Sequence, residues 1–191
     1  MIYFLLVLLG LTIGSFVSVV TYRIPRGLGF VVGRSFCDSC KKELKWYDNI
    51  PLISFLLYRG KSRCCEKKIS IRYPIIEFAS AVGFVTLYLF SLSPEYYVLC
   101  TILLAILVID LEHQIIPDEL TWIVLILGLI ANSQSLMTAL FSGLFLSLLL
   151  LTLYLITSGR GMGLGDVKLA IPLGLILGLE KGVYWLITSF I

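Results

Sequence analysis

Two aspartates lie where a carboxylate is costly in an apolar chain, so both are candidates for chemistry. Asp166 follows Gly163 and Gly165 in a glycine-rich break between two long apolar runs, and Asp110 ends another apolar run. A carboxylate at the edge of a membrane span is expensive unless it has a function. When two such groups come close they share one proton, so that one can act as general base on a water and the other as general acid. We interpret Asp110 and Asp166 as a candidate catalytic pair.

The acidic residues also have structural explanations. Asp166 could cap the N-terminus of the helix that follows it. Asp110 is harder to explain in this way, because a negative charge at a helix C-terminus is mildly unfavourable. We assign Asp118 and Glu119 to a helix start, where carboxylates complement the helix dipole. Glu112 is expected to be a solvated loop residue.

The glycines before Asp166 leave two possibilities open. Gly163 and Gly165 would permit positive φ angles and a close approach of the backbone to a bound peptide strand. Alternatively, Gly159 and Gly163 provide small residues for close helix packing. We do not expect a phosphate-binding loop, because the Walker spacing is absent and no strand precedes the glycines.

Four of the five cysteines form a candidate metal site. Cys37 and Cys40 have the Cys-x-x-Cys spacing of a zinc ligand pair, and Cys64 and Cys65 follow in the same polar segment. Disulfides are not expected if this segment is cytoplasmic. The second pair is irregular, because adjacent residues rarely both ligate one tetrahedral ion. The sequence predicts a small domain held together by a metal ion, for which zinc suits the ligands.

The elements that must position these residues are membrane helices. Of the 191 residues, 59% are hydrophobic, and the mean hydropathy is +0.99, well above that of a soluble domain. Several apolar runs approach the length that crosses a hydrocarbon core of about 30 Å, and they lack the alternation of a β-barrel. The predicted fold is all-α, a polytopic helical membrane protein with a small cytoplasmic cysteine-containing insertion.

Six spans are predicted, although the last is incomplete. Residues 182–191 are apolar but too short to cross a bilayer. The domains expected from this division are the first transmembrane helix (1–22), the cytoplasmic cysteine domain (23–74) and a transmembrane core (75–191). The predicted spans cover residues 1–22, 75–90, 96–109, 120–131 and 136–157, and a sixth begins over 169–179.

The basic residues set the expected orientation. Of the fifteen Lys and Arg residues, twelve lie between Arg23 and Arg72, which places that segment in the cytoplasm. They follow the first apolar run instead of preceding it, so this run is expected to be a retained helix and not a signal peptide. Counting alternate crossings puts both Asp110 and Asp166 at cytoplasmic ends of spans. No nucleic-acid partner is expected, because the basic segment also carries acids and lies between spans.

Together these motifs resemble one family, the bacterial type IV prepilin peptidases, which are polytopic aspartyl proteases with a Gly-x-Gly-Asp motif. The resemblance covers nearly the whole chain and rests on the order and spacing of the motifs. They are Gly14-Ser15-Phe16, Tyr22-Arg23-Ile24-Pro25, Cys37-x-x-Cys40, Trp46-x-x-Asn49-Ile50-Pro51, Arg59-Gly60-Lys61, Ile69-Ser70-x-Arg72-Tyr73-Pro74-x-x-Glu77, Asp110 with Ile116-Pro117-Asp118, and Gly163-x-Gly165-Asp166-x-Lys168.

The resemblance implies a function and its residues. Asp110 and Asp166 would be the catalytic pair of a membrane endopeptidase, with Gly163, Gly165 and Lys168 in its substrate loop. It implies cleavage of the basic leader of type IV prepilin or pseudopilin precursors on the cytoplasmic side of the bacterial inner membrane. Many members also methylate the new N-terminal amine with S-adenosylmethionine, for which this sequence shows no legible binding motif.

Three features depart from the family pattern. The family usually has two Cys-x-x-Cys pairs, but Ser62 stands where the third cysteine is expected and Cys65 matches the fourth. Cys64 could substitute, or the site could have three ligands. Ser18 occupies a position that is often Asn. The chain ends at Ile191, where relatives continue through further helices, so we expect either a shorter form or the absence of the last helices.

Two other functions are compatible with parts of the sequence. A catalytically degenerate membrane scaffold of a pilus, secretion or competence assembly would fit the irregular cysteines. A small transporter would place its acids in the middle of spans, whereas Asp110 and Asp166 lie at span ends. The two aspartates and the glycine loop favour the peptidase.

Overall fold

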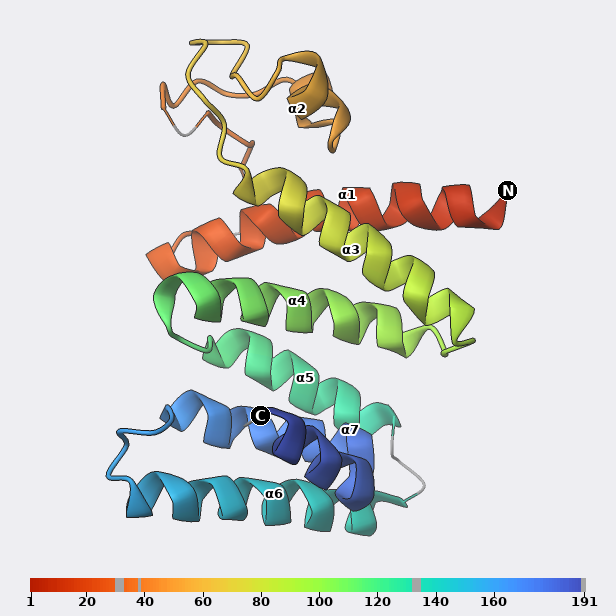
Figure 1. The fold of residues 1–191 in the computed structure, drawn as a ribbon, viewed down its shortest axis with the longest axis vertical. Coiled ribbons are helices and arrows are strands. Elements are labelled where there is room, and N and C mark those ends of the chain that lie inside the picture. The colour runs from red at the N-terminus through yellow and green to blue at the C-terminus, as the bar shows by residue number, and fades with distance from the viewer. Residues whose placement is uncertain (30–32, 38, 132–134, 190–191) are drawn as a thin grey trace. The chain divides into compact units, whose positions relative to one another are not determined.

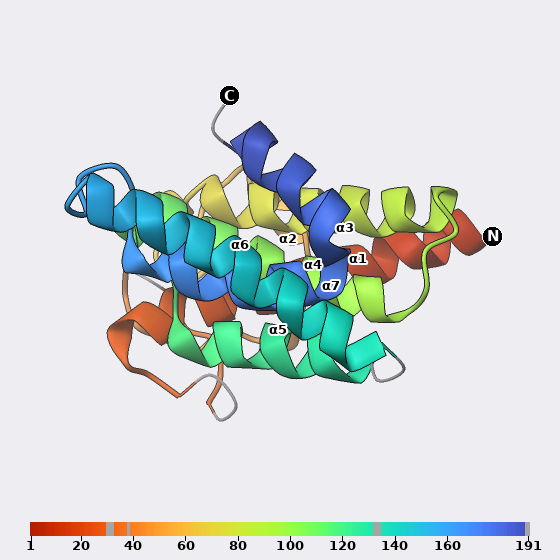
Figure 2. The ribbon, with the colours of Figure 1, turned by 90° about the horizontal axis from the view of Figure 1, so that it is seen from below.

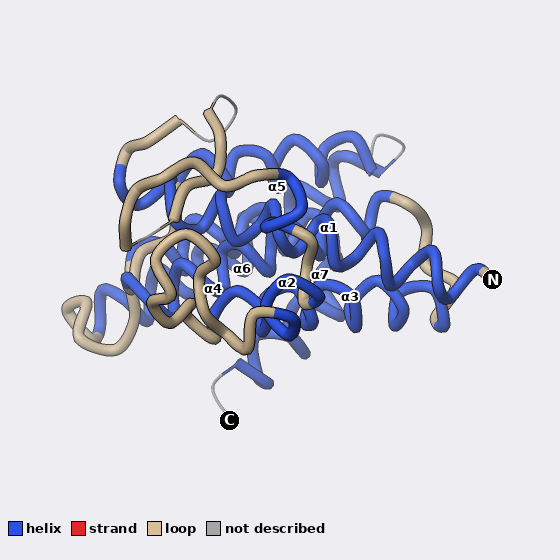
Figure 3. Tube along the Cα trace, turned by 90° about the horizontal axis from the view of Figure 1, so that it is seen from above, coloured by secondary structure: helices blue, strands red, loops and turns tan. Residues whose placement is uncertain are grey.

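The structure is a computed structural model that describes residues 1–29, 33–37, 39–131 and 135–189. Within these ranges every regular element is a helix, and β-type pairing is limited to two isolated bridges (Figures 1 and 3). The chain forms two compact units, unit 1 over Met1–His113 and unit 2 over Gln114–Ile191. The predicted all-α class is confirmed.

Each predicted apolar run forms a long helix. Unit 1 contains the first three of these helices and unit 2 contains the last three. Pro74 lies in the first turn of its helix, where a missing N–H leaves no intrahelical hydrogen bond unmade. The helices are α1 (Ile2–Arg23), α3 (Arg72–Leu89), α4 (Glu95–His113), α5 (Asp118–Ala131), α6 (Leu136–Ile156) and α7 (Leu164–Ser189).

Among the described residues, four helices are long and apolar enough to cross a membrane, namely α1, α4, α6 and α7. α3 has 18 residues but carries Arg72 and Glu77, and α5 has only 14 residues. At 1.5 Å per residue α5 extends about 21 Å, less than the hydrocarbon core of about 30 Å. The count of six crossings, and the orientation that depends on it, stays a prediction.

In unit 1, α1 packs closely against α3 because small residues lie where the two helices meet. A Cβ atom at Gly10 would lie 2.5 Å from the Cα of Ala81, and one at Gly14 would lie 2.6 Å from the Cα of Glu77. Any side chain at either glycine would push the helices apart. α4 packs against both of these helices.

In unit 2, α7 packs against both α5 and α6 and is therefore the central helix. Gly174 of α7 meets Gly143 of α6 so closely that a Cβ atom at Gly174 would lie 2.6 Å from the Cα of Gly143. This contact brings the apolar faces of the two helices together. The buried side chains of the resulting core are Leu146, Leu150, Val167, Ala170 and Leu186.

α7 differs from its prediction at both ends. It begins at Leu164, so Gly165 and Asp166 lie inside the helix, where a loop was expected. Residues 182–189 continue the helix after a bend at Gly178, whose φ of 73° favours glycine (Figure 2). Residues 190–191 of the predicted C-terminal run lie outside the described ranges.

The segment between α1 and α3 has little regular structure. Arg23, the last residue of α1, is 6% exposed. Its guanidinium connects this segment to α1 by donating to the carbonyl oxygens of Gly29 and Arg34 at 3.1 and 3.0 Å. A segment with so few helical residues needs a further source of stability, which a metal ion can supply. Its elements are η1 (Ile24–Arg26), η2 (Trp46–Asn49) and α2 (Ile53–Leu57).

Candidate functional site

Two short loops of similar geometry carry the four cysteines of the candidate metal site. In the first knuckle (residues 36–43), an isolated bridge joins Phe36 to Glu43. The Cys37 N–H donates to the Lys42 carbonyl at 2.9 Å, and the Lys41 N–H donates to the Cys37 carbonyl at 2.8 Å. Lys41 has a φ of 59°, as the tight turn requires.

The second knuckle (residues 61–68) repeats this pattern. An isolated bridge joins Lys61 to Lys68, the Ser62 N–H donates to the Lys67 carbonyl at 2.8 Å, and the Glu66 N–H donates to the Ser62 carbonyl at 2.8 Å. Glu66 has a φ of 57°.

The repeated hydrogen bonds align Ser62 with Cys37 and Cys65 with Cys40. Cys64 is then the additional thiol, one position before Cys65. Ser62 therefore occupies the first ligand position of the second knuckle, as the spacing of the family motif implied.

All four thiols converge on one point. The sulfurs lie within 4.8 Å of one another, with 3.7 Å between Cys37 and Cys65 and 3.0 Å between Cys40 and Cys64. Zn–S bonds of about 2.3 Å in a tetrahedron place the sulfurs roughly 3.8 Å apart, so this cluster fits such an ion. Both adjacent cysteines reach the cluster, and Cys64 fills the place beside Ser62, with its Sγ 3.1 Å from the Ser62 Oγ.

The two cysteines of the first knuckle differ in acidity. Burial acts to raise the pKa of Cys37, but hydrogen bonds from the Ser62 hydroxyl and from the backbone of Cys40 and Ser39 together lower it to about 6. The hydrogen bond shared with the Cys64 thiol raises the pKa of Cys40 to about 12. Metals bind the thiolate, so Cys37 is the more readily available ligand of the two.

Asp166 lies in the first turn of α7 and contacts the residue before the helix. Its Oδ2 accepts the N–H of Gly163 at 3.1 Å, the backward half of a capping box. The capping explanation is therefore present in the structure, with Gly163 at the cap and Asp166 three residues inside the helix. This bond fixes the rotamer of the carboxylate and is compatible with a catalytic role.

The glycines around Asp166 act through close packing. Neither Gly163 nor Gly165 has a positive φ; in this break the positive φ angles belong to Ser158 and Gly159. A Cβ atom at Gly165 would lie 3.0 Å from the Cβ of Ile116, so glycine brings α7 against the residues that precede α5. Of the two possibilities left open for these glycines, close packing is the one that the structure shows at Gly165, and neither glycine adopts a positive φ because both join a helix start.

Lys168 forms an ion pair with Asp118, which the sequence placed at a helix start. Its Nζ donates to both carboxylate oxygens of Asp118, at 2.8 and 3.1 Å. The two residues are 50 positions apart in the chain, and the Ile116-Pro117-Asp118 motif was the only sequence indication of a role for Asp118.

Asp110 lies in the last turn of α4, which continues to His113. Glu112 is therefore helical and forms an ion pair with Arg72, whose side chain is 18% exposed. Arg72 also donates to the buried hydroxyl of Thr21 at 2.7 Å. Glu112 is exposed, as expected, but it lies in a helix and not in a loop, where α1, the start of α3 and the end of α4 meet at Arg72.

Asp110 belongs to unit 1 and Asp166 to unit 2. Their pairing as a dyad stays a prediction, as does the role of Gly163, Gly165 and Lys168 in substrate binding.

The fold and the site define an all-helical membrane protein with a four-cysteine cluster that could hold a metal ion and a Gly-x-Gly-Asp helix start. Residues 8–91 match the bacterial peptidase A24 N-terminal domain, and residues 97–191 match the type IV leader peptidase family. The chain belongs to this family and is an inner-membrane protein, and its described residues include the four helices that are long and apolar enough to cross a bilayer.

Several curated proteins are similar to most of the chain. The prepilin leader peptidase/N-methyltransferase of Klebsiella pneumoniae is 36% identical, over 92% of this chain and 85% of the relative. The protein with the same name from Pseudomonas aeruginosa is 37% identical, over 88% of this chain and 70% of the relative. That of Legionella pneumophila is 33% identical, over 92% of this chain and 74% of the relative. No solved structure matches the chain.

Proposed function

We propose that this chain is a membrane aspartyl endopeptidase that removes the leader peptide of type IV prepilin or pseudopilin precursors at the cytoplasmic boundary of the inner membrane. The observation that carries the proposal is the similarity to the Klebsiella pneumoniae prepilin leader peptidase/N-methyltransferase over 85% of that protein. The positions of Asp110 and Asp166 at helix ends support it, because a substrate anchored by an apolar helix presents its scissile bond near the membrane boundary.

Hydrolysis follows from two carboxyl groups that share one proton. The ionised carboxylate takes a proton from a water, which attacks the carbonyl carbon of the scissile bond, and the protonated carboxyl donates to the carbonyl oxygen. The nitrogen of the leaving segment then takes a proton as the bond breaks. The hydrogen bond from Gly163 holds the Asp166 carboxylate in one rotamer for these transfers.

The same protein methylates the new N-terminal amine with S-adenosylmethionine. The names of the relatives, which pair the peptidase with an N-methyltransferase, support this second activity. When bound, the cofactor supplies the methyl group from a sulfonium. The task of the chain is to bind this donor and to orient the amine toward it.

Cys37, Cys40, Cys64 and Cys65 hold a structural zinc ion. The convergence of the four sulfurs supports this assignment. A site closed by four thiolates leaves no open position for substrate, so zinc would stabilise the cysteine domain without entering hydrolysis.

The test is cleavage of an intact prepilin by the purified protein in detergent. Asp110→Asn and Asp166→Asn are each expected to lower the rate at least about 10³-fold, because each removes one half of a proton-sharing pair. Glu119→Gln, at an exposed position of the α5 start, is the matched control and should cleave normally. Normal cleavage by either Asn variant would overturn the proposal, and a wild type that binds prepilin without cleaving it would favour the scaffold.

Mass spectrometry of the processed pilin tests the second activity. The expected product carries one methyl group on its new N-terminus when S-adenosylmethionine is present. An unmodified N-terminus under these conditions would remove the methyltransferase assignment.

A further inference from the structure

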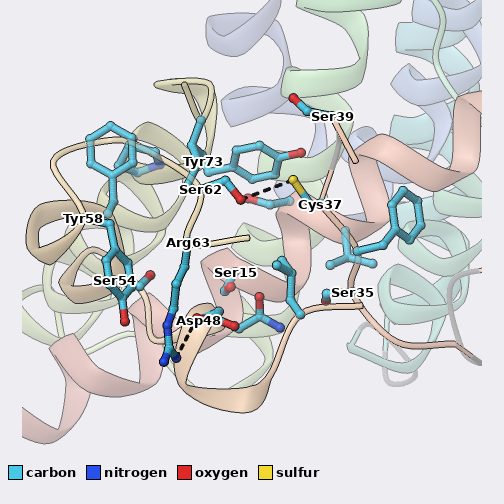
Figure 4. Close-up of a pocket in the computed structure, with 18 of the residues that line it drawn as sticks. Ser15, Ser35, Cys37, Ser39, Asp48, Ser54, Tyr58, Ser62, Arg63 and Tyr73 are labelled. Carbon is cyan, nitrogen blue, oxygen red and sulfur yellow. Dashed lines mark hydrogen bonds and ion pairs between the residues drawn. The ribbon is translucent and has the colours of Figure 1, made fainter. Parts of the chain in front are cut away.

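Unit 1 contains a cavity of about 160 Å³ between the two knuckles and the adjoining ends of α1 and α3. Its walls are mostly apolar, and Figure 4 shows Tyr58 and Tyr73 on the wall together with Cys37 and Ser62 of the cysteine cluster. The cavity opens to solvent, so a ligand can extend beyond it. Apolar walls with a few polar groups are typical of small-molecule sites. The aromatic residues of the lining are Tyr22, Phe36, Phe55, Tyr58 and Tyr73.

A buried carboxylate lines this cavity. Glu77, in the second turn of α3, is 7% exposed. Its Oε2 accepts the Leu52 N–H at 2.8 Å, and the Ser15 hydroxyl also hydrogen-bonds to it. In the described part of the chain no Lys, Arg or His forms an ion pair with it. A buried carboxylate is costly without a cation, so a positively charged ligand would be favoured here.

Glu77 also has a structural explanation that must be separated from ligand binding. Leu52 has a φ of 56°, which is unusual for a non-glycine residue, and the hydrogen bond from its N–H to Glu77 holds this turn. A glutamine at position 77 would keep an oxygen acceptor for Leu52 and lose only the charge. The two roles therefore predict different results for one substitution.

The lining favours a ligand with three chemical parts. The carboxylate of Glu77 and the aromatic rings attract a cation. The same rings can stack on a flat aromatic group. The exposed side chains of Lys61 and Lys68 also line the cavity and suit a carboxylate on the ligand, whereas Arg63 pairs with Asp48 of the same lining. An adenosyl sulfonium with an amino-acid tail has all three parts.

We propose that this cavity is the methyl-donor site, where S-adenosylmethionine binds with its sulfonium near Glu77 and its adenine among the aromatic rings. The inference rests on the proposed N-methyltransferase activity and assigns it a place in the chain. In the transfer, the electron pair of the amine forms a bond to the methyl carbon as the carbon–sulfur bond breaks. S-adenosylhomocysteine leaves as a neutral thioether, and the surplus proton of the methylated amine passes to water.

The cysteine cluster shares a wall with this site, since Cys37 and Ser62 both line the cavity. The metal-bound knuckles would therefore hold one side of the methyl-donor site in place. Removal of the metal should weaken donor binding, even though no metal ligand touches the reacting atoms.

The test compares binding of S-adenosylmethionine and of its neutral product to the full-length protein in detergent, by calorimetry. The wild type should bind the sulfonium at least about tenfold more tightly than the thioether, because only the sulfonium offers Glu77 a charge. Glu77→Gln should lose this preference. Tyr58→Leu should weaken both ligands, because it removes a stacking surface. Glu180→Gln, exposed on α7 in unit 2, is the matched control and should bind like the wild type.

Three results would overturn the site. One is an unchanged preference in Glu77→Gln, which would leave Glu77 only its structural role. A second is stronger binding of ATP than of S-adenosylmethionine. A third is photo-crosslinking of labelled S-adenosylmethionine to peptides outside residues 15–77, a result that does not depend on how Glu77→Gln folds. A wild type that methylates pilin yet fails these tests contradicts the cavity alone, whereas a wild type that neither cleaves nor methylates contradicts the proposed function.

Discussion

Lys168 donates to both carboxylate oxygens of Asp118, at 2.8 and 3.1 Å, and so joins the N-terminal turns of α7 and α5. Gly165 meets Ile116 in the same region. Asp166 lies between Gly165 and Lys168 in the chain. The contact of Gly165 with Ile116 and the ion pair of Lys168 with Asp118 therefore both fix the helix start that carries Asp166. We infer that Lys168 positions Asp166 through Asp118.

Loss of the ion pair between Lys168 and Asp118 should slow cleavage while leaving the free energy of unfolding almost unchanged. Both side chains are more than half exposed, so Lys168→Met and Asp118→Asn should each change the free energy of unfolding by less than about 1 kcal/mol. Each should lower kcat about tenfold by loosening the position of Asp166, and the double variant should be no slower than either single variant. Steady-state kinetics on prepilin measures this. A raised KM in Lys168→Met alone would instead make Lys168 a substrate-binding residue.

The cysteine cluster predicts a specific rescue. Cys64→Ser should lower the zinc affinity at least about 100-fold, because three thiolates remain. Adding Ser62→Cys to this variant should restore the affinity, because Ser62 occupies the position in the second knuckle that Cys37 occupies in the first. Competition with a chromophoric chelator measures both affinities. Full zinc binding by Cys64→Ser, or no rescue by the second substitution, would contradict the assignment of Cys64 as a ligand.

Zinc binding should strengthen as the pH rises from 6 to 8. Zinc binds thiolates, so every proton still on a cysteine must be released. The pKa of Cys37 is lowered to about 6, so this thiol is mostly ionised at neutral pH, while that of Cys40 is raised to about 12, so its proton is displaced by the metal. Ser62→Ala removes a hydrogen bond that lowers the pKa of Cys37, and it should reduce the affinity more at pH 6 than at pH 8. An affinity independent of pH would contradict this prediction.

Arg72 should stabilise the end of α4 that carries Asp110. Arg72→Gln loses the partly buried ion pair with Glu112 and the hydrogen bond to Thr21, so it should lower the free energy of unfolding by about 1–3 kcal/mol and slow cleavage. The control is Arg34→Gln, whose ion pair with Glu43 has side chains 80% and 68% exposed. Thermal unfolding in detergent should show a lower Tm for Arg72→Gln only. Equal Tm values for the two variants would show that Arg72 has no such role.

Much of the fold could be predicted because the bilayer restricts what an apolar run can form. Each apolar run forms one of the long helices, because in lipid the backbone N–H and C=O groups must find their hydrogen-bond partners within the helix. The start of α7 could not be predicted from composition. Glycine disfavours helices, yet Gly165 lies inside one because its lack of a side chain allows the contact with Ile116.

The sequence predicted which residue types form the candidate site but not the contacts between them. The spacing of Cys37 and Cys40 indicated a metal, but only the repeated hydrogen bonds of the two knuckles explain how Cys64 joins the cluster beside Ser62. Ion pairs such as Arg72 with Glu112 depend on how distant helices pack, which no local pattern records.

The central claim is that Asp110 and Asp166 act as one catalytic unit, and a double-mutant cycle on prepilin cleavage tests it most directly. Residues that share one proton lose their function together, so the Asp110→Asn/Asp166→Asn double variant should be no slower than the slower single variant. A double variant whose loss equals the product of the two single losses would show independent roles and contradict the pair.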